Sequence, residues 1–232
     1  MTTRYRAVLF DLDGTLIDSL ADLANATNYA LAKLGCPTHP REAYRYFVGD
    51  GARTLCARAL PADRQDLVER ALELMRAHYE RHCFDESRPY PGIEDLLAAL
   101  QRRAVPMAVL SNKPDAFTKR VVRHFFPKVT FAVVRGQLLH LPLKPDPMAA
   151  RQIAEDVGIE AAHWLYLGDT NTDMRTARAA GMFAVGALWG FRPREELEEA
   201  GAEAVVAAPS EVLRWFPAQP TGSTERNDYG CS

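Results

Sequence analysis

The chain has 232 residues, of which 47% are hydrophobic and 25% are charged, and this composition is typical of a globular protein with a large buried core. It excludes disorder over most of the length. The net charge of −2 and the pI near 6.3 provide no overall attraction to nucleic acid or to an anionic membrane, so we expect neither as a partner.

Targeting segments and bound metals leave characteristic patterns that this sequence lacks. No apolar run approaches the roughly 20 residues that a membrane-spanning helix needs, and the first residues do not have the pattern of a signal peptide. We therefore expect a cytoplasmic protein. The four cysteines have no C-x-x-C spacing and no histidine at zinc-like spacing, and we expect free thiols at Cys36, Cys56, Cys83 and Cys231.

Short apolar runs along the chain predict five buried β-strands, at residues 4–10, 105–110, 129–134, 163–168 and 182–188. Stretches with helical spacing lie between the later runs, at 114–126, 146–158 and 171–181. The last two end in glycine, as helices often do. This alternation predicts an α/β fold, a Rossmann-like three-layer core with a parallel sheet covered by helices on both faces.

One long spacing indicates an insertion after the first strand. Asp11 and Ser111 lie 100 residues apart, whereas a strand–helix–strand crossover needs only about 30. Residues 18–88 contain apolar positions at helical spacing and no clear strand. We expect an all-helical cap at 18–88 with hinges near 16–20 and 86–91, a catalytic core made of 1–17 and 89–216, and a flexible tail at 217–232.

Polar side chains follow several predicted strands at the point where each strand ends. Asp11 and Asp13 follow the first run, Ser111 and Asn112 follow the second, and Asp169 follows the fourth. The carboxyl ends of parallel strands meet at one edge of a sheet, where ligands bind, so we expect these side chains to lie close together.

The carboxylates at this edge need a counter-charge. The stretch "GDTNTD" at 168–173 adds Asp173 to the three aspartates already named, and carboxylates that converge repel one another unless a cation lies among them. Mg²⁺ binds through one or two carboxylates together with water and phosphate, which suits a site of this kind. Lys144, before a helix that begins with proline, could supply a positive charge to an anionic substrate or could be an exposed loop lysine.

Four motifs in order resemble those of the haloacid dehalogenase superfamily, in its phosphatase branch. They are "DLDGTLIDS" at 11–19, "LSNKP" at 110–114, "LKPDP" at 143–147 and "GDTNTDM" at 168–174, and the resemblance extends over residues 4–214. The stretches 47–55, 168–182 and 189–202 are similar to phosphoglycolate phosphatases. The segment "VVRGQLLHLPLK" at 133–144 departs from the Gly-Gly-Asp stretch usual in those enzymes, which leaves the exact substrate open.

The resemblance implies a role for each motif residue. Asp11 would be the nucleophile, Asp13 the general acid and base, and Lys144 a catalytic group that holds phosphoryl oxygens. Mg²⁺ would be bound by Asp11, by the backbone carbonyl of Asp13 and by Asp169, with Asp173 orienting the metal shell or binding the ion. The expected substrate-binding residues are Thr15, Ser111, Asn112, Lys144 and Arg53, the last as a clamp for a substrate carboxylate in a cap loop at 49–53.

The expected function is Mg²⁺-dependent hydrolysis of a small phosphate monoester, 2-phosphoglycolate, through an aspartyl-phosphate intermediate. Inorganic pyrophosphate hydrolysis, sugar-phosphate hydrolysis and phosphomutase transfer are alternatives that would use the same groups. A non-catalytic module that binds Mg²⁺ or phosphate is an alternative of a different class. Asp13, two residues after the expected nucleophile, argues against such a module.

Overall fold

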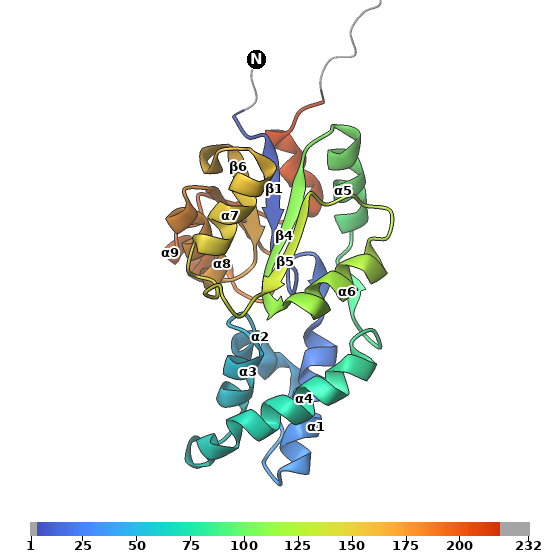
Figure 1. The fold of residues 1–232 in the computed structure, drawn as a ribbon, viewed down its shortest axis with the longest axis vertical. Coiled ribbons are helices and arrows are strands. Elements are labelled where there is room, and N and C mark those ends of the chain that lie inside the picture. Colours follow the sequence, from blue (N-terminus) through green and yellow to red (C-terminus); the bar gives the residue numbers. More distant parts are fainter. Residues whose placement is uncertain (1–3, 219–232) are drawn as a thin grey trace, which may run out of the picture.

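The computed structural model of the chain describes residues 4–218. Its central sheet has six parallel strands in the order β5-β4-β1-β6-β7-β8 (Figure 1). The strands of this sheet are β1 (Ala7–Phe10), β4 (Met107–Pro114), β5 (Val133–Gln137), β6 (Trp164–Gly168), β7 (Phe183–Ala187) and β8 (Ala204–Val206). The predicted parallel-sheet core is confirmed.

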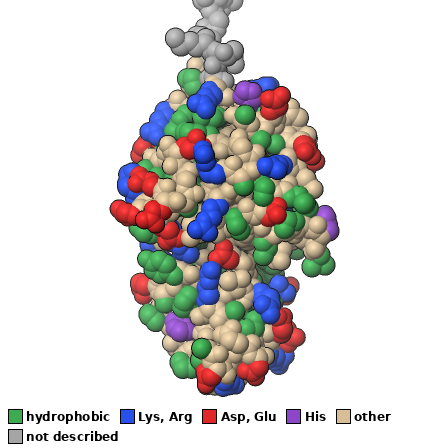
Figure 2. All heavy atoms as spheres, turned by 90° about the vertical axis from the view of Figure 1, so that its left-hand side faces the viewer, with side chains coloured by type: hydrophobic (Ala, Val, Ile, Leu, Met, Phe, Trp, Pro, Cys, Tyr) green, Lys and Arg blue, Asp and Glu red, His purple; other side chains and the backbone are tan. Residues whose placement is uncertain are grey.

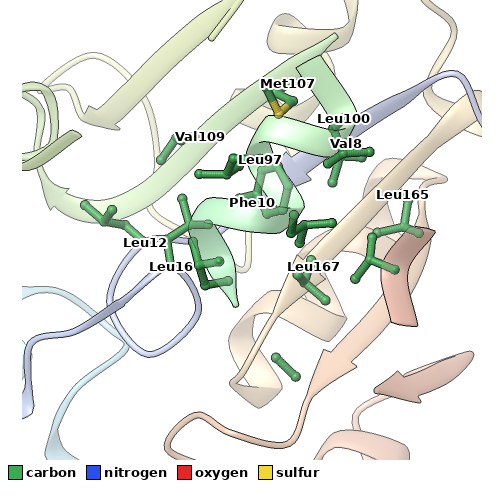
Figure 3. Packing of buried hydrophobic residues seen from close by; sticks show 14 of the residues in the cluster. Val8, Phe10, Leu12, Leu16, Leu97, Leu100, Met107, Val109, Leu165 and Leu167 are labelled. Atoms are coloured by element: carbon green, nitrogen blue, oxygen red, sulfur yellow. The ribbon is translucent and has the colours of Figure 1, made fainter. Parts of the chain in front are cut away.

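Helices cover both faces of this sheet because successive side chains of each strand point to opposite faces. Val8 and Phe10 belong to one buried cluster and Ala7 and Leu9 to another, on the other face. The first cluster is covered by α5 (Ile93–Arg102), α6 (Asp115–Phe125) and the 3₁₀ helix η4 (Pro209–Trp215), and the second by α7 (Met148–Val157), α8 (Asn171–Ala180) and α9 (Arg194–Glu199). Figure 3 shows Leu97 and Leu100 of α5 packed beside Phe10.

A helical lobe interrupts the core between β1 and β4 and lies below the sheet in Figure 1. It has its own buried cluster, which is largely made of residues 20–83. Its helices are α1 (Leu20–Lys33), η1 (Arg41–Ala43), α2 (Tyr44–Phe47), α3 (Ala52–Ala59), η2 (Ala62–Leu67) and α4 (Val68–His82). We call this lobe the cap, and the inserted helical cap of the predicted fold is thereby confirmed.

Two chain segments join the cap to the core side by side. They form a short antiparallel pair, β2 (Ile17–Asp18) with β3 (Arg88–Pro89). Asp22 at the start of α1 ties the two segments together, because its carboxylate accepts hydrogen bonds from the amides of Glu86 and Ser87, both at 2.9 Å, and from the Ser87 hydroxyl. The exact limits of the two domains, 18–88 for the cap, stay a prediction.

The sheet differs from the sequence-based prediction at its two edges. The strand predicted at 129–134 begins at Val133 and continues to Gln137, and β8 is a strand that we did not predict. Both are edge strands, whose side chains are mostly half-buried. The last residues of β5 are therefore not apolar, and β8 has only three residues, which is too short to give a clear strand pattern.

Three further sequence-based predictions concern cysteines, membranes and the tail. Cys36, Cys56 and Cys83 are buried free thiols, as predicted, and Cys231 lies outside the described residues, as does most of the tail predicted at 217–232. Among the described helices, none has the length and apolar character required to cross a membrane. On the face drawn in Figure 2, acidic and basic side chains are interspersed over both lobes.

Candidate active site

The loop after β1 carries the first two aspartates. Asp11 directly follows the strand, and its amide donates to the carbonyl of Leu167 in β6 at 2.9 Å. The chain then turns back at Gly14, whose φ of +94° is in the left-handed region that glycine tolerates. A β-carbon added to Gly14 would lie 2.2 Å from Oδ2 of Asp169. The absence of a side chain here is therefore what lets the β1 loop and the β6 loop meet.

Three buried carboxylates converge at the sheet edge. Oxygen atoms of Asp11, Asp169 and Asp173 all lie within 4.8 Å of one another. Burial, followed by the charge of Asp173, raises the pKa of Asp11 to about 7, and Lys144 opposes this shift. Burial and the charges of Asp11 and Asp173 also raise the pKa of Asp169 well above its ordinary value. These groups form an oxygen-only set that a hard divalent cation would stabilise.

Lys144 lies inside this carboxylate group. Its Nζ is 2.8 Å from Oδ1 of Asp11 and 2.6 Å from Oδ1 of Asp173, and the side chain is buried. Burial alone would lower the pKa of this ammonium group, but the two carboxylates raise it well above the ordinary value. Lys144 is therefore a fixed positive charge at the point where the sequence predicts a phosphoryl-binding group.

Asn112 positions the loop that carries Lys144. Its side chain accepts a hydrogen bond from the Lys144 amide at 2.9 Å and donates to the Lys144 carbonyl at 3.1 Å. The same amide group also donates to the carbonyl of Gly49 in the cap at 3.0 Å. Ser111, which lines the pocket, accepts from the amide of Lys113. Of these two predicted substrate-binding residues, Ser111 faces the pocket with its side chain free to donate its proton, and Asn112 holds the backbone.

Asp169 and Asp173 are oriented by neighbouring donors. The Thr15 hydroxyl donates to Oδ1 of Asp169 at 2.7 Å, and the Phe191 amide donates to Oδ2 at 2.9 Å. Thr15 therefore orients Asp169, and the substrate-binding role expected for Thr15 from sequence stays a prediction. Asp173 is the third residue of α8 and forms a capping box with Thr170, so its Oδ2 accepts from the amide and the hydroxyl of that residue.

The carboxylate of Asp13 lies outside the three-carboxylate group and has different partners. Nζ of Lys113 lies 2.6 and 2.9 Å from its two oxygens, and the hydroxyl of Ser19 donates to Oδ1 at 2.6 Å. Sequence reasoning missed Lys113, although it directly follows Ser111 and Asn112 in the same motif. The role expected for the backbone carbonyl of Asp13 in binding metal stays a prediction.

A pocket between the cap and the sheet edge leads to Asp11 and Asp13. Its core side includes Ser111, Asn112 and Lys113, and its cap side includes residues 48, 49, 51 and 52 together with one face of α4. The loop predicted to reach toward the site does so, since Asp50 accepts a hydrogen bond from Thr172 of α8 at 2.7 Å.

Arg53 does not lie where the clamp hypothesis requires. Its side chain is two-thirds exposed and forms an ion pair with Glu69 at 2.7 Å on the cap surface. The arginine that lines the pocket is Arg76 of α4. The structure therefore corrects the choice of Arg53. The reason is that α3 begins at Ala52, so that residue faces the pocket and the next position on the helix points elsewhere.

Comparisons with known proteins agree with this geometry. Residues 8–187 match the family model described as haloacid dehalogenase-like hydrolase. A phosphoglycolate phosphatase of Pseudomonas putida is 39% identical over 80% of this chain and 70% of its own length, and one of Pseudomonas syringae pv. tomato is 36% identical over 87% and 76%.

A solved structure has the same architecture. A haloacid dehalogenase-like family hydrolase from Streptococcus pneumoniae superposes with a TM-score of 0.84 at 26% identity, covering 93% of this chain and all of the other. The family model matches most of the chain, and the parallel-sheet core and the helical cap agree with it. The chain therefore belongs to the haloacid dehalogenase-like hydrolase family.

Proposed function

We propose that this hydrolase is a Mg²⁺-dependent phosphatase that cleaves a small phosphate monoester, with 2-phosphoglycolate as the substrate, through an aspartyl-phosphate on Asp11. The observation that carries the proposal is the contact of Lys144 with two of the three buried carboxylates at the sheet edge. A cation, an ammonium group and a nucleophilic carboxylate around one point are what phosphoryl transfer requires. The relatives named phosphoglycolate phosphatase support the choice of substrate.

The donor set fits Mg²⁺. Asp11 and Asp169 would hold the ion, because their carboxylates are buried together, and burial and mutual repulsion raise the pKa of both. Asp173 already accepts four hydrogen bonds, from Lys144, Tyr166 and Thr170, so we assign it to orienting the shell. When bound, Mg²⁺ would neutralise part of the charge on the phosphoryl oxygens and on the nucleophile.

In the first step, a carboxylate oxygen of Asp11 attacks phosphorus and the bond from phosphorus to the leaving oxygen breaks. Lys144, fixed by its loop, binds the phosphoryl oxygens as negative charge spreads over them, and the Ser111 hydroxyl donates to them from the core side of the pocket. Asp13, in its protonated form, gives its proton to the leaving oxygen.

In the second step, the Asp13 carboxylate removes a proton from water, which attacks phosphorus and frees Asp11. Lys113 and Ser19 hold this carboxylate at two sides and thereby fix its direction. The cap covers the pocket, so bulk water is kept from the aspartyl-phosphate until the leaving group has departed. We propose that residues 18–88 move as one lid about the β2–β3 connection.

A substrate panel at one Mg²⁺ concentration tests this function. Release of inorganic phosphate would be measured with 2-phosphoglycolate, pyrophosphate and glucose 6-phosphate, and conversion of glucose 1-phosphate to glucose 6-phosphate would report phosphomutase transfer. We expect the highest kcat/KM with 2-phosphoglycolate.

The nucleophile is tested by a single variant. Asp11→Asn should lower kcat for every substrate by about 10⁴-fold or more, because it replaces the carboxylate nucleophile with a weakly nucleophilic amide of nearly the same size. Retention of the wild-type melting temperature would show that the variant is folded. Substantial turnover in Asp11→Asn would contradict the mechanism.

A further inference from the structure

The pocket has two unlike walls. The core wall presents Asp11, Asp13 and Lys113, whereas the wall formed by the cap and by α6 is mainly apolar. The apolar side chains of the second wall are Leu23, Val48, Leu55, Met75 and Phe117. Because Asp13 delivers its proton to the leaving oxygen, the rest of the leaving group must extend from the core wall toward this apolar wall.

Tyr79 of α4 is the first polar group on the apolar wall. The residue is only 3% exposed, and within the described residues its hydroxyl makes no hydrogen bond of good geometry, although the ammonium group of Lys113 lies near it. The ring is held against Phe117, with centroids 5.7 Å apart, and Nζ of Lys113 lies 4.9 Å from the ring centroid. A buried hydroxyl without a partner is unfavourable, and a polar atom of a bound ligand would correct this.

Arg76 is the second polar group, and it lies one helical turn before Tyr79. Residues three apart on a helix share a face, and both side chains line the pocket. Four other cap arginines are in ion pairs with cap carboxylates: Arg41 with Glu86, Arg53 with Glu69, Arg58 with Asp50 and Arg70 with Glu73. Within the described part of the chain, Arg76 is in no such pair, so its charge is available to an anion that enters the pocket.

We propose that Arg76 and Tyr79 together read the leaving group, and that they select a short apolar segment that ends in a carboxylate. This inference rests on the proposed phosphatase function and assigns the specificity of the same site to two residues. The guanidinium binds the carboxylate at the mouth of the pocket, and the Tyr79 hydroxyl donates to an oxygen of the leaving group deeper inside. The apolar side chains pack around the carbon atoms between these two contacts.

The apolar wall should also lower the affinity of the pocket for sugar phosphates. A sugar leaving group would place several hydroxyls against Leu23, Leu55 and Met75, which offer no hydrogen-bond partners. Each unpaired hydroxyl would reduce transition-state binding, because its bonds to water are lost on entry. We therefore expect 2-phosphoglycolate to be preferred over glucose 6-phosphate through the cap wall, although the phosphoryl site treats the two alike.

Two matched substrates isolate the carboxylate contact. 2-Phosphoglycolate and ethyl phosphate have leaving groups of similar length, and only the first carries a carboxylate. Values of kcat/KM for both would be measured with the wild-type protein, Arg76→Met, Tyr79→Phe and the control Arg70→Met, which removes an ion-paired arginine from the surface of the same helix.

We expect Arg76→Met to lower kcat/KM for 2-phosphoglycolate about 10- to 100-fold, mainly through KM, and to change the value for ethyl phosphate much less. Tyr79→Phe should lower kcat/KM for 2-phosphoglycolate about 3- to 10-fold. Arg70→Met should leave the ratio of the two substrates as in the wild-type protein. Arg76→Lys, which keeps the charge and loses the forked geometry, should restore part of the ratio.

Each contrary result has a distinct meaning. Equal losses for the two substrates in Arg76→Met would overturn the inference and leave the phosphatase function intact, as would a wild-type protein that cleaves ethyl phosphate as well as 2-phosphoglycolate. A wild-type protein that cleaves no phosphate monoester would overturn the proposed function itself, and the inference with it.

Discussion

The two walls of the pocket differ in whether their polar side chains have partners within the protein. On the core wall, charged side chains have fixed partners, since Asp11 is paired with Lys144, and Asp13 with Lys113 and Ser19. On the cap wall, the apolar side chains lie beside the exposed Arg76, which is in no ion pair among the described residues, and the buried hydroxyl of Tyr79. Under the proposed function, this difference would separate the chemistry, which needs fixed charges, from selection of the substrate, which needs groups free to bind it.

This comparison predicts different kinetic behaviour for the two walls. Changes on the core wall should lower kcat by the same factor for every phosphate monoester. Changes on the cap wall should alter the ratio between substrates. The variants below test the division in order of decreasing effect.

The largest effect after loss of the nucleophile is expected at the metal. Removal of Mg²⁺ by a chelator should lower activity at least about 10³-fold, and Asp169→Asn should do the same at ordinary Mg²⁺ concentrations. Calorimetry provides a readout that does not depend on turnover. An ion at about 100 times its Kd stabilises the folded protein by about 2.7 kcal/mol, so saturating Mg²⁺ should raise the wild-type Tm by several degrees.

Asp169→Asn should show little of that rise in Tm, because one of the two carboxylates assigned to the ion is gone. A rise as large as in the wild-type protein would place the ion elsewhere. A wild-type protein whose Tm does not respond to Mg²⁺ would contradict the metal assignment.

Lys113 should produce an intermediate effect. Lys113→Met removes the ion pair that directs Asp13, and we expect kcat to fall about 10²-fold for 2-phosphoglycolate and ethyl phosphate alike, since both need a proton on the leaving oxygen. The matched control is Lys119→Met, which removes an exposed lysine paired with Asp115 on α6. A loss of kcat with only one of the two substrates would contradict this role and would indicate that Lys113 selects the substrate.

Arg53 should have the smallest effect. Its ion pair with Glu69 is exposed, and such pairs contribute about 0–1 kcal/mol to stability. Arg53→Ala should therefore leave KM for 2-phosphoglycolate within about twofold of the wild-type value. A KM that rises tenfold would restore the clamp hypothesis and would require a different position of α3 in the substrate complex.

The sequence predicts the core wall much better than the cap wall. Asp11, Ser111 and Asp169 each follow an apolar run, and the carboxyl ends of parallel strands necessarily meet, so their convergence follows from the pattern of elements alone. The sequence did not indicate a role for Lys113, because a lysine in a loop is ordinarily solvated. Only the structure shows that its ammonium group is buried against Asp13.

The cap residues could not be found from periodicity. A helical pattern predicts which face of α4 is buried, but not which end of the helix lies over the sheet edge, and that orientation alone brings Tyr79 beside Lys113. The contact of Thr15 with Asp169 was not predicted for a related reason, since the two residues lie 154 positions apart in the chain. In both cases the missing information is a contact between distant segments.

The capping box of α8 links the start of a helix to the reaction centre. One oxygen of Asp173 accepts from the backbone and hydroxyl of Thr170, while the other accepts from Lys144. A ligand that attracts Lys144 should therefore change the hydrogen bonds between Asp173 and Thr170 in the first turn of this helix. Hydrogen–deuterium exchange of the backbone amides at 170–173 should consequently serve as a built-in reporter of occupancy. For the same reason, a loss of activity in an Asp173 variant would combine two effects, the loss of the helix cap and the loss of a contact with Lys144.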